Sequence, residues 1–514
     1  MATDEPRPSS HANLNPVRTR GISRVLAAVL AGAVSALALT SPGQAQDPDL
    51  SWPLNDYGTG TVGFIIEDTW RLESEIRAWA RGVQPVCSSM DDPECVGLAK
   101  KNGWWILRVA PPCVTALDWE ECVESLSLVD RRGDVTALSF TGLSPGKRFE
   151  PDPKRGLPTG STMSLYDDPA SDDPDVGYAV YVGGQMSARQ GPFNLNDLSL
   201  QIMRYRLTPW ERSNLSGRCL WETSTHCAHR LAFPEDTRLR LSVRLHESVT
   251  GWLGGRLEQP AIDVQPIRGS LNRVVITALP VDVPLISLAI PMELATPEIK
   301  AYWRDNTDCG DGPCPLNVGG VQSSGPHTAD YLRIFAPFLG DTATRAIPSW
   351  NVVNLLDHAN NPCLVSTERL LGLVTTNATG YEASPPAFRN NALKYQVAGL
   401  HYLPDGNVFQ GSYDLVMRSD TARCLYGFSD APVQAEIQVT SDDGVEQVVT
   451  TSLAEKDGWL RLSARGFHFS QPTITVKLTS QASEKTILCK KGKKTKKVTG
   501  VKPKCPKGWK LIRP

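Results

Sequence analysis

Several motifs that mark common metal sites and enzymes are missing from this 514-residue sequence. It has no C-x-x-C, no H-E-x-x-H and no Walker A motif, so we expect neither the usual zinc sites nor a P-loop. After residue 45 it has no apolar run long enough to span a membrane. Its last 30 residues contain no Asp or Glu. These absences leave compartment, architecture and surface charge as the most informative features.

The first 45 residues have the pattern of a cleaved signal peptide. Arg18, Arg20 and Arg24 precede a weakly hydrophobic run from Val25 to Leu39, and small residues lead up to Ala45. This run has 15 residues, whereas a spanning helix needs roughly 20. Cleavage after Ala45 is therefore favoured over an uncleaved anchor. We expect a secreted or cell-surface protein with no transmembrane span after cleavage.

All twelve cysteines follow the signal peptide and group into neighbouring pairs. An even number of cysteines in an exported chain favours disulfides. The simplest pairing joins neighbours, although the first four cysteines could also exchange partners. The expected pairs are Cys87 with Cys95, Cys113 with Cys122, Cys219 with Cys227, Cys309 with Cys314, Cys363 with Cys424, and Cys489 with Cys505.

Glycine and proline are abundant, with 41 and 39 residues, which favours many turns and few long helices. We predict a mainly β, multi-domain fold with antiparallel β-sandwich-like domains, a few short helices and a C-terminal disulfide-closed hairpin. The length suggests roughly three domains. The expected divisions are a signal peptide (1–45), a cysteine-containing domain (46–155), a β-rich middle domain (156–300), a linker (301–326), a β-sandwich domain (327–482) and a basic tail hairpin (483–514).

Local patterns predict several individual elements. Apolar residues recur at helical spacing within Asp68–Arg81, which predicts a helix, and a second short helix is expected at Thr296–Trp303. The run Arg238–Leu245 alternates Leu or Val with Arg or Ser, as a strand with one dry face does. Val433–Val439 also alternates, and a turn then leads to Val448–Leu453, which predicts a hairpin between these two runs.

Matches to catalytic motifs fail on their local context. Gly142–Gly146 fits G-x-S-x-G, but Pro145 follows the serine and has no N–H to supply to an oxyanion hole. Ser144 and Lys147 fit S-x-x-K, yet the companion motifs S-D-N and K-T-G are absent. Gly58–Gly63 fits G-x-G-x-x-G without a buried strand before it. We therefore expect turns at these places, and no catalytic residue.

Candidate metal ligands are equally weak. His226 and His229 could hold a metal only if they lay on a helix, which their loop does not clearly form. The acidic cluster within 167–175 lacks the ligand spacing and glycine of an EF-hand, so we expect a solvated loop there. For the acidic residues within 305–311 we expect a disulfide-closed surface turn. We expect neither a metal nor a cofactor.

The charge of the chain is divided between an acidic body and a basic tail. Residues 485–514 carry +12 and residues 1–45 carry +2, so a whole-chain charge of −2 leaves −16 for residues 46–484. Clustered lysines are attracted to anionic surfaces. We predict contact with anionic cell-wall polymer or lipid headgroups, and not with nucleic acid, through Lys490, Lys491, Lys493, Lys494, Lys496, Lys497, Lys502 and Lys504. A solvated hairpin that only aids secretion or solubility is the simpler alternative.

Several segments of the chain look familiar. They are Val374–Tyr381, Tyr395–Val439, Asp457–Leu478 and the tail Cys489–Cys505, with Pro111–Cys113 and Glu121–Leu126 nearer the start. These segments resemble uncharacterised secreted proteins of actinobacteria, and the likeness is strongest over the last third of the chain. The resemblance implies export and a β-rich fold, and it implies no assigned activity.

These observations favour an exported, non-catalytic cell-surface or secreted protein. The alternative is a secreted carbohydrate-binding protein or glycoside hydrolase, because the chain has 13 Trp and 55 acidic residues from which a carboxylate pair could come. The sequence does not identify such a pair. Four of the tryptophans have apolar neighbours and are expected in the core, namely Trp79, Trp104, Trp252 and Trp459.

Overall fold

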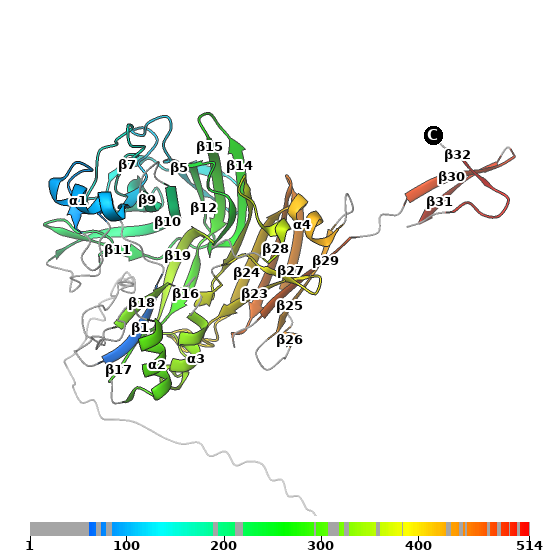
Figure 1. Ribbon diagram of the computed structural model, residues 1–514. Helices are drawn as coiled ribbons and strands as arrows, with labels where there is room; N and C mark the ends of the chain where they lie inside the picture. Colours follow the sequence, from blue (N-terminus) through cyan, green and yellow to red (C-terminus); the bar gives the residue numbers. More distant parts are fainter. Residues whose placement is uncertain are drawn as a thin grey trace, which may run out of the picture. The chain divides into compact units, whose positions relative to one another are not determined.

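The protein is described here from a computed structural model, which Figure 1 shows as a ribbon. The predicted signal peptide, Cys309, Cys314, Lys493 and Lys502 lie outside the described residues. The structure describes residues 61–67, 73–78, 85–188, 194–210, 219–291, 294–306, 318–322, 328–355, 360–382, 384–427, 433–440, 446–447, 450–469, 473–480, 485–492, 494–500 and 504–512.

The described part of the chain is mainly β, which confirms the predicted fold class. Its largest sheet has 15 strands, most of them antiparallel, and only β13 and β20 pair in parallel within it. The strands are β2 (Glu75–Ala78), β3 (Val86–Cys87), β4 (Trp104–Val109), β7 (Phe140–Leu143), β8 (Ser164–Asp167), β9 (Val176–Ala188), β10 (Asn194–Pro209), β11 (His226–Leu231), β13 (Gly251–Arg256), β16 (Val281–Leu285), β19 (Arg345–Asn354), β20 (Leu370–Thr376), β24 (Gly411–Arg418), β27 (Thr450–Lys456) and β28 (Trp459–Phe467).

Two further sheets cover parts of this large sheet. A five-stranded sheet has the order β14-β15-β12-β5-β6, and a six-stranded sheet has the order β21-β23-β29-β25-β26 with β22 paired to β23. The first contains β5 (Cys122–Val129), β6 (Val135–Ala137), β12 (Arg238–His246), β14 (Glu258–Pro266) and β15 (Leu271–Leu279). The second contains β21 (Gly380–Tyr381), β22 (Ala387–Arg389), β23 (Ala392–Ala398), β25 (Val433–Thr440), β26 (Glu446–Gln447) and β29 (Thr473–Ser480).

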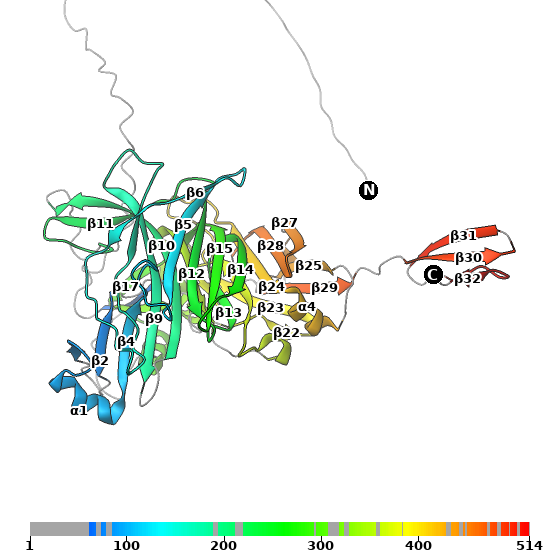
Figure 2. The same cartoon turned by 90° about the horizontal axis from the view of Figure 1, so that it is seen from above.

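Two three-stranded sheets complete the described strands. One joins β1 (Thr61–Glu67) to β17 (Ser287–Pro291) and, in parallel, to β18 (Val318–Gln322). The other lies at the C-terminal end and joins β30 (Lys485–Lys491) to β31 (Lys494–Gly500) and β32 (Lys510–Ile512), as Figure 2 shows. The predicted tail hairpin is therefore present, and a third strand is added to it.

Helices are few and short in the described residues. They are α1 (Pro93–Asn102), α2 (Pro297–Asn306), α3 (Thr328–Leu339), α4 (Ser419–Tyr426) and the 3₁₀ turn η3 (Pro362–Leu364). The helix expected near Thr296 is confirmed as α2, in which Pro297 occupies the first turn. At α1, the side chain of Asp92 caps the helix by accepting the Glu94 N–H at 3.0 Å.

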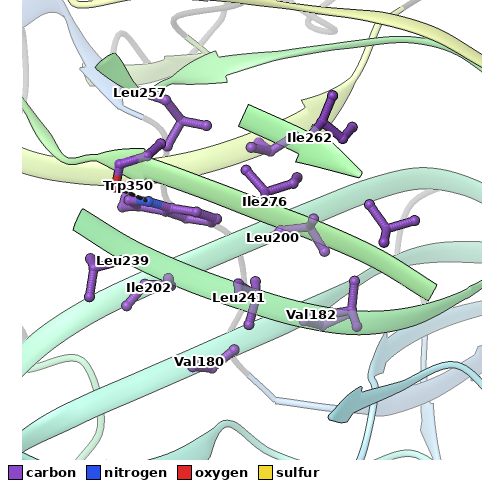
Figure 3. Packing of buried hydrophobic residues seen from close by; sticks show 14 of the residues in the cluster. Val180, Val182, Leu200, Ile202, Leu239, Leu241, Leu257, Ile262, Ile276 and Trp350 are labelled. Carbon is purple, nitrogen blue, oxygen red and sulfur yellow. Dashed lines mark hydrogen bonds between the residues drawn. The ribbon is translucent and has the colours of Figure 1, made fainter. Parts of the chain in front are cut away.

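The main core lies between the five-stranded sheet and the large sheet. As predicted, Leu239, Leu241 and Val243 of β12 are buried on one face of their strand. They face residues of β9, β10 and β19, including Trp350, whose indole N–H donates to the Ala278 carbonyl at 3.4 Å (Figure 3). This arrangement is a β-sandwich, in which the inner faces of two sheets share one core.

The middle strands of the large sheet are covered on both faces. All seven residues of β20 are buried, so this strand shows no alternation of apolar and polar residues. On β24, Val416 packs into the core shared with the five-stranded sheet. Its neighbours Leu415 and Met417 pack into a second core with Tyr395 and Ile474 of the six-stranded sheet. The protein thus stacks two sandwiches that share the strands of one sheet.

The predicted domain divisions do not coincide with breaks in hydrogen bonding. The segments 46–155, 156–300 and 327–482 all contribute strands to the large sheet. The segment 301–326, expected as a linker, contains the end of α2 and the strand β18. The three segments that were expected to form separate domains therefore contribute to one continuous sheet.

Two local predictions are wrong. In place of a helix across Asp68–Arg81, the described residues form strand β2, with Ile76 opposite Ile106 of β4. The expected hairpin partner of β25 also differs, because β25 pairs with β26 over only two residues. Strand β27 instead pairs with β28 through a two-residue turn at Asp457 and Gly458, whose φ angles of 55° and 76° suit a tight hairpin.

Among the described residues, five disulfides join the neighbouring cysteines that the sequence predicts to pair. Several disulfides in one chain indicate an oxidising environment. Four close short loops, whereas Cys363 and Cys424 are 61 residues apart and join η3 to α4. The bonds are Cys87–Cys95, Cys113–Cys122, Cys219–Cys227, Cys363–Cys424 and Cys489–Cys505.

Candidate functional site

The C-terminal sheet places five of the eight predicted lysines on its strands, namely Lys490, Lys491, Lys494, Lys496 and Lys497. Strand β30 is central, because it pairs with β31 over seven residues and with β32 over three. Cys489 in β30 is fully buried and bonded to Cys505, with 5.6 Å between their Cα atoms. Successive side chains of a strand point to opposite faces, and directly paired residues share a face. The register therefore assigns each described lysine of these strands to one of two faces.

One face, called here the open face, combines lysines with apolar side chains. Its first row across the three strands is Thr495, Lys490 and Lys510. Its second row is Lys497, Leu488 and Ile512. The three lysines are exposed, and Leu488 keeps 43% of its surface exposed. A cationic surface with an accessible apolar centre results.

The opposite face carries Lys491, Lys494 and Lys496 together with Leu511 and the directly paired Ile487 and Val498. It also holds the disulfide of Cys489, which ties the segment 504–509 to this side of the sheet. Gly508 of that segment has φ +86°, and a Cβ added there would lie 3.6 Å from the Lys491 Nζ. This segment therefore lies close to Lys491, while Lys491, Lys494 and Lys496 remain exposed.

Like charges face each other directly in this sheet. Lys491 is paired with Lys494, and Lys490 with Lys510. Such pairs destabilise a sheet, and residues 485–514 contain no carboxylate side chain to offset them. An external anion would relieve this repulsion. The predicted set omitted Lys510, because nothing in its local sequence shows that it returns to lie beside Lys490.

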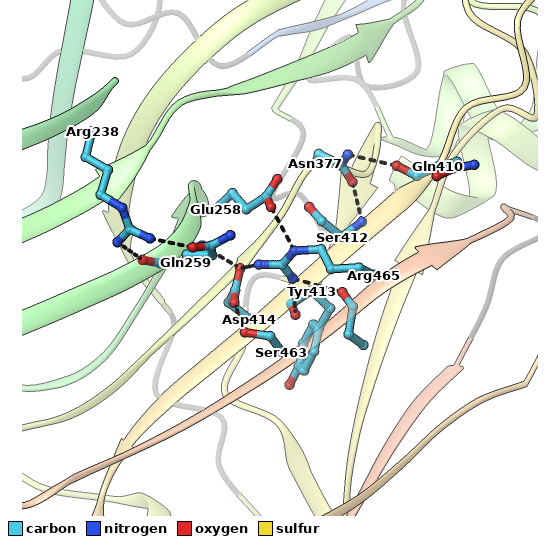
Figure 4. A network of polar contacts seen from close by, with 11 residues as sticks. Arg238, Glu258, Gln259, Asn377, Gln410, Ser412, Tyr413, Asp414, Ser463 and Arg465 are labelled. Carbon is cyan, nitrogen blue, oxygen red and sulfur yellow. Dashed lines mark hydrogen bonds and ion pairs between the residues drawn. The ribbon is translucent and has the colours of Figure 1, made fainter. Parts of the chain in front are cut away.

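A buried polar network forms a second candidate (Figure 4). Asp414 is 2% exposed and accepts hydrogen bonds from Arg465 Nη2 at 2.6 Å, from the Gln259 N–H at 3.0 Å and from Ser463. Arg465 Nε also donates to Glu258 at 2.9 Å. Desolvation by burial raises the pKa of Asp414, and the charge of Arg465 opposes this only in part. The network joins β14 of one sheet to β24 and β28 of the other. Its contacts therefore stabilise the packing of the two sheets.

Glu124 on β5 is held in a similar way near the surface. It accepts from Arg273 Nε at 2.6 Å, from Arg244 Nε at 2.7 Å and from the Ser242 hydroxyl at 2.9 Å. Partial burial would raise its pKa, but these hydrogen bonds outweigh burial and lower the pKa to about 2. A carboxylate that stays ionised to such low pH is unsuited to act as a general acid near neutrality.

The weak metal and nucleophile candidates are not assembled into sites. His226 and His229 both lie on β11, three residues apart, so their side chains leave opposite faces of the strand. Ser144 is fully buried, and its hydroxyl is therefore inaccessible to a substrate. Within the described residues, no group of three His, Cys, Asp or Glu is placed to hold a metal ion.

An apolar loop closed by a disulfide is the third candidate. Between Cys113 and Cys122, three side chains are exposed: Val114 at 81%, Leu117 at 38% and Trp119 at 40%. The base of the loop is fixed, because the buried Glu120 accepts the Thr159 N–H at 2.7 Å. Trp119 was not among the tryptophans expected in the core, and its exposed neighbour Asp118 could have indicated this.

A search for helices long and apolar enough to cross a membrane finds none among the described residues. Comparison with protein-family models finds no match to this chain, and comparison with curated proteins finds none either. We therefore infer function from the charge, register and burial of the residues described above.

Proposed function

We propose that this chain is an exported, non-catalytic protein whose C-terminal sheet binds an anionic surface of the cell envelope, either wall polymer or lipid headgroups. The observation that carries this proposal is the set of described lysines fixed on β30, β31 and β32 in a segment without carboxylate side chains. Folded strands hold these charges close together, so an extended anionic surface can contact several lysines at once.

Two further observations support the proposal. The disulfides agree with an oxidising compartment, as expected for a chain that begins with a signal-like segment. Glu124 and Asp414, two carboxylates with several hydrogen-bond partners each, are both held by arginine. These contacts stabilise the fold and give neither carboxylate a role in catalysis.

Deleting residues 485–514 tests the proposal. In cells, we expect the truncated protein to move from the cell fraction into the medium, because each lysine near an anionic surface contributes about 1 kcal/mol at moderate salt. The same release from wild-type cells is expected when the salt concentration is raised to about 1 M, where the Debye length falls to roughly 3 Å. Fractionation and immunoblotting measure both effects. Unchanged cell association after the deletion would refute the proposal.

Carbohydrate binding is the second candidate function, and the exposed Trp119 favours it. An indole ring on a rigid, disulfide-closed loop can stack on the apolar face of a sugar at small entropic cost. The adjacent side chains of Thr115 and Asp118 are exposed and could accept hydrogen bonds from sugar hydroxyls.

A pull-down on cell-wall and plant polysaccharides tests this second candidate. Trp119→Ala should weaken retention roughly tenfold, since a stacking contact is worth about 1–1.5 kcal/mol. Leu117→Ala is the matched control, because Leu117 lies in the same loop with similar exposure and has no ring to stack. Absence of retention for the unaltered protein, or equal loss in both variants, would exclude sugar stacking at Trp119.

A further inference from the structure

The turn that joins β5 to β6 carries the sequence Arg132-Gly133-Asp134, which occurs once in the chain. All residues from Asp130 to Ala137 are exposed. The side chains of Arg132 and Asp134 are 85% and 80% exposed. A guanidinium and a carboxylate that are close in the sequence are therefore both presented to solvent at the end of one hairpin.

Asp130 fixes the backbone of this turn. Its carboxylate Oδ1 accepts the Arg132 N–H at 2.8 Å and the Asp134 N–H at 2.9 Å, and its carbonyl accepts the Gly133 N–H at 3.0 Å. Gly133 has φ +91°, in the left-handed region that glycine adopts without strain. A turn followed by such a glycine is a common hairpin connection. The tripeptide is therefore held in one backbone conformation before any partner binds, which reduces the entropy lost on binding.

Contacts within the protein hold the side chains of the tripeptide only weakly. The Arg132 Nε lies 3.5 Å from the Asp130 carboxylate and 3.9 Å from the Asp134 carboxylate. Ion pairs between side chains this exposed contribute little stability, so a partner can displace them. The preceding Arg131 is instead paired with Asp236. Arg132 is therefore the arginine of this turn that a partner can bind at small cost.

We propose that this turn binds a receptor of the integrin class, in which Arg132 enters an acidic recess and Asp134 becomes a ligand of the receptor's divalent cation. Such a hard cation prefers carboxylate oxygens, and a guanidinium forms paired hydrogen bonds with carboxylates. A Cβ added at Gly133 would meet nothing within 4 Å, so the receptor surface can approach the backbone between the two charges closely. The inference depends on export, as the proposed function does, and it does not depend on the lysines of the C-terminal sheet.

The presentation of the tripeptide, and not its occurrence, carries this inference. Three residues match by chance in many proteins, but a buried or helical copy could not reach a recessed cation. Here Val129 of β5 pairs with Val135 of β6, and the tripeptide lies beyond this last pair of the two strands. Both charges can therefore enter a recess while the hairpin behind them stays folded.

The experiment measures binding of residues 46–514 to the immobilised ectodomain of a fibronectin-binding integrin in Mn²⁺, by surface plasmon resonance. Arg132→Gln should weaken binding at least about 30-fold, because it leaves the carboxylates of the acidic recess without their cation. Arg131→Gln is the matched control, since it removes the same charge from the preceding residue. It should weaken binding less than about threefold.

A second set of variants tests the role of the carboxylate. Asp134→Glu keeps the charge but moves the carboxylate by one methylene, and it should weaken binding about 100-fold. Asp457→Glu is its matched control, because Asp457 is 74% exposed at the β27–β28 turn and lies outside the tripeptide. That variant should bind as the unaltered protein does. Chelation of divalent cations should abolish binding, and circular dichroism verifies that each variant is folded.

Deleting residues 485–514 separates this inference from the proposed function. The deletion should leave receptor binding unchanged, whereas it should release the protein from its own cell envelope. The inference is wrong if the unaltered protein does not bind the receptor, or if the deletion abolishes binding. Equal loss in the two arginine variants, or binding that survives chelation or Asp134→Glu, would also overturn it.

Discussion

Replacing Arg465 with methionine is expected to lower the free energy of unfolding by about 3–5 kcal/mol, because it leaves the buried Asp414 carboxylate without its cation. Asp414 is 2% exposed, and Arg465 also bonds Glu258 across the sandwich. Chemical unfolding of residues 47–514, followed by circular dichroism, measures the loss. Arg333→Met is the control, since the Arg333–Glu298 pair is more than half exposed and should contribute less than about 1 kcal/mol.

The same variant should show a defined dependence on pH. The folded-state pKa of Asp414 lies above its ordinary value of 3.8, so ionising this group costs stability as the pH rises through that range. Without Arg465 the folded-state pKa rises further, and the destabilisation should be largest at neutral pH and shrink as Asp414 becomes protonated in acid. Adding Asp414→Asn to the variant should restore part of the stability at neutral pH. A loss that is independent of pH would contradict this account.

Removing the Cys363–Cys424 disulfide is expected to cost about 4 kcal/mol. The bond closes a loop between cysteines 61 residues apart, and the entropy that a cross-link removes from the unfolded chain grows with loop length. Replacing both cysteines with serine should therefore shift the unfolding midpoint strongly. The bond also holds α4 against η3, where Leu364 and Leu425 are buried, so loss of local packing would add to the effect.

A matched comparison isolates the contribution of loop length. Cys87 and Cys95 are only eight residues apart, so the same pair of serine substitutions there should cost about 2.5 kcal/mol. If chain entropy determines the stabilisation, the loss in the free energy of unfolding should be larger in the Cys363/Cys424 variant than in the Cys87/Cys95 variant. A larger loss at the short loop would show that local packing, and not loop closure, determines the stabilisation.

Much of the architecture could be predicted because it depends on short-range patterns. The cysteine pairs follow from spacing, and the alternation from Arg238 to Leu245 follows from a strand with one buried face. The tail hairpin was predictable for a related reason, because two cysteines flank its basic segment. Apart from Cys363 and Cys424, which are 61 residues apart, each of these features is carried by residues close to one another in the sequence.

The failures concern residues whose partners are distant. Glu75 is 4% exposed in β2, where it accepts a hydrogen bond at 2.7 Å from Lys147, 72 residues away. The local sequence pattern predicts that this carboxylate faces solvent. It therefore favoured an exposed helix over a buried strand. Likewise, β27 pairs with β28 across the turn at Asp457 and Gly458 and so joins the large sheet. The alternation of β25 had instead suggested β25 as its partner.

The candidate site was predictable only as a set of charges. The count of lysines and the absence of acidic residues predict an anionic partner. The division into two faces depends on the register of β30 with β31 and on the return of β32, and these brought Lys510 beside Lys490. Composition alone cannot supply this register, because a shift by one residue would exchange the two faces.

The shared sheet also has a consequence for how the chain folds. Strand β10 pairs with β19 although Leu200 and Val352 are far apart in the sequence, and Arg465 reaches Glu258 across 207 residues. Contacts of such high sequence separation must close long loops before they contribute any stability, which slows folding. The central sandwich therefore cannot be completed until almost the whole chain has been synthesised, so the protein is expected to remain an open, unstructured polypeptide for longer than one built from independent domains.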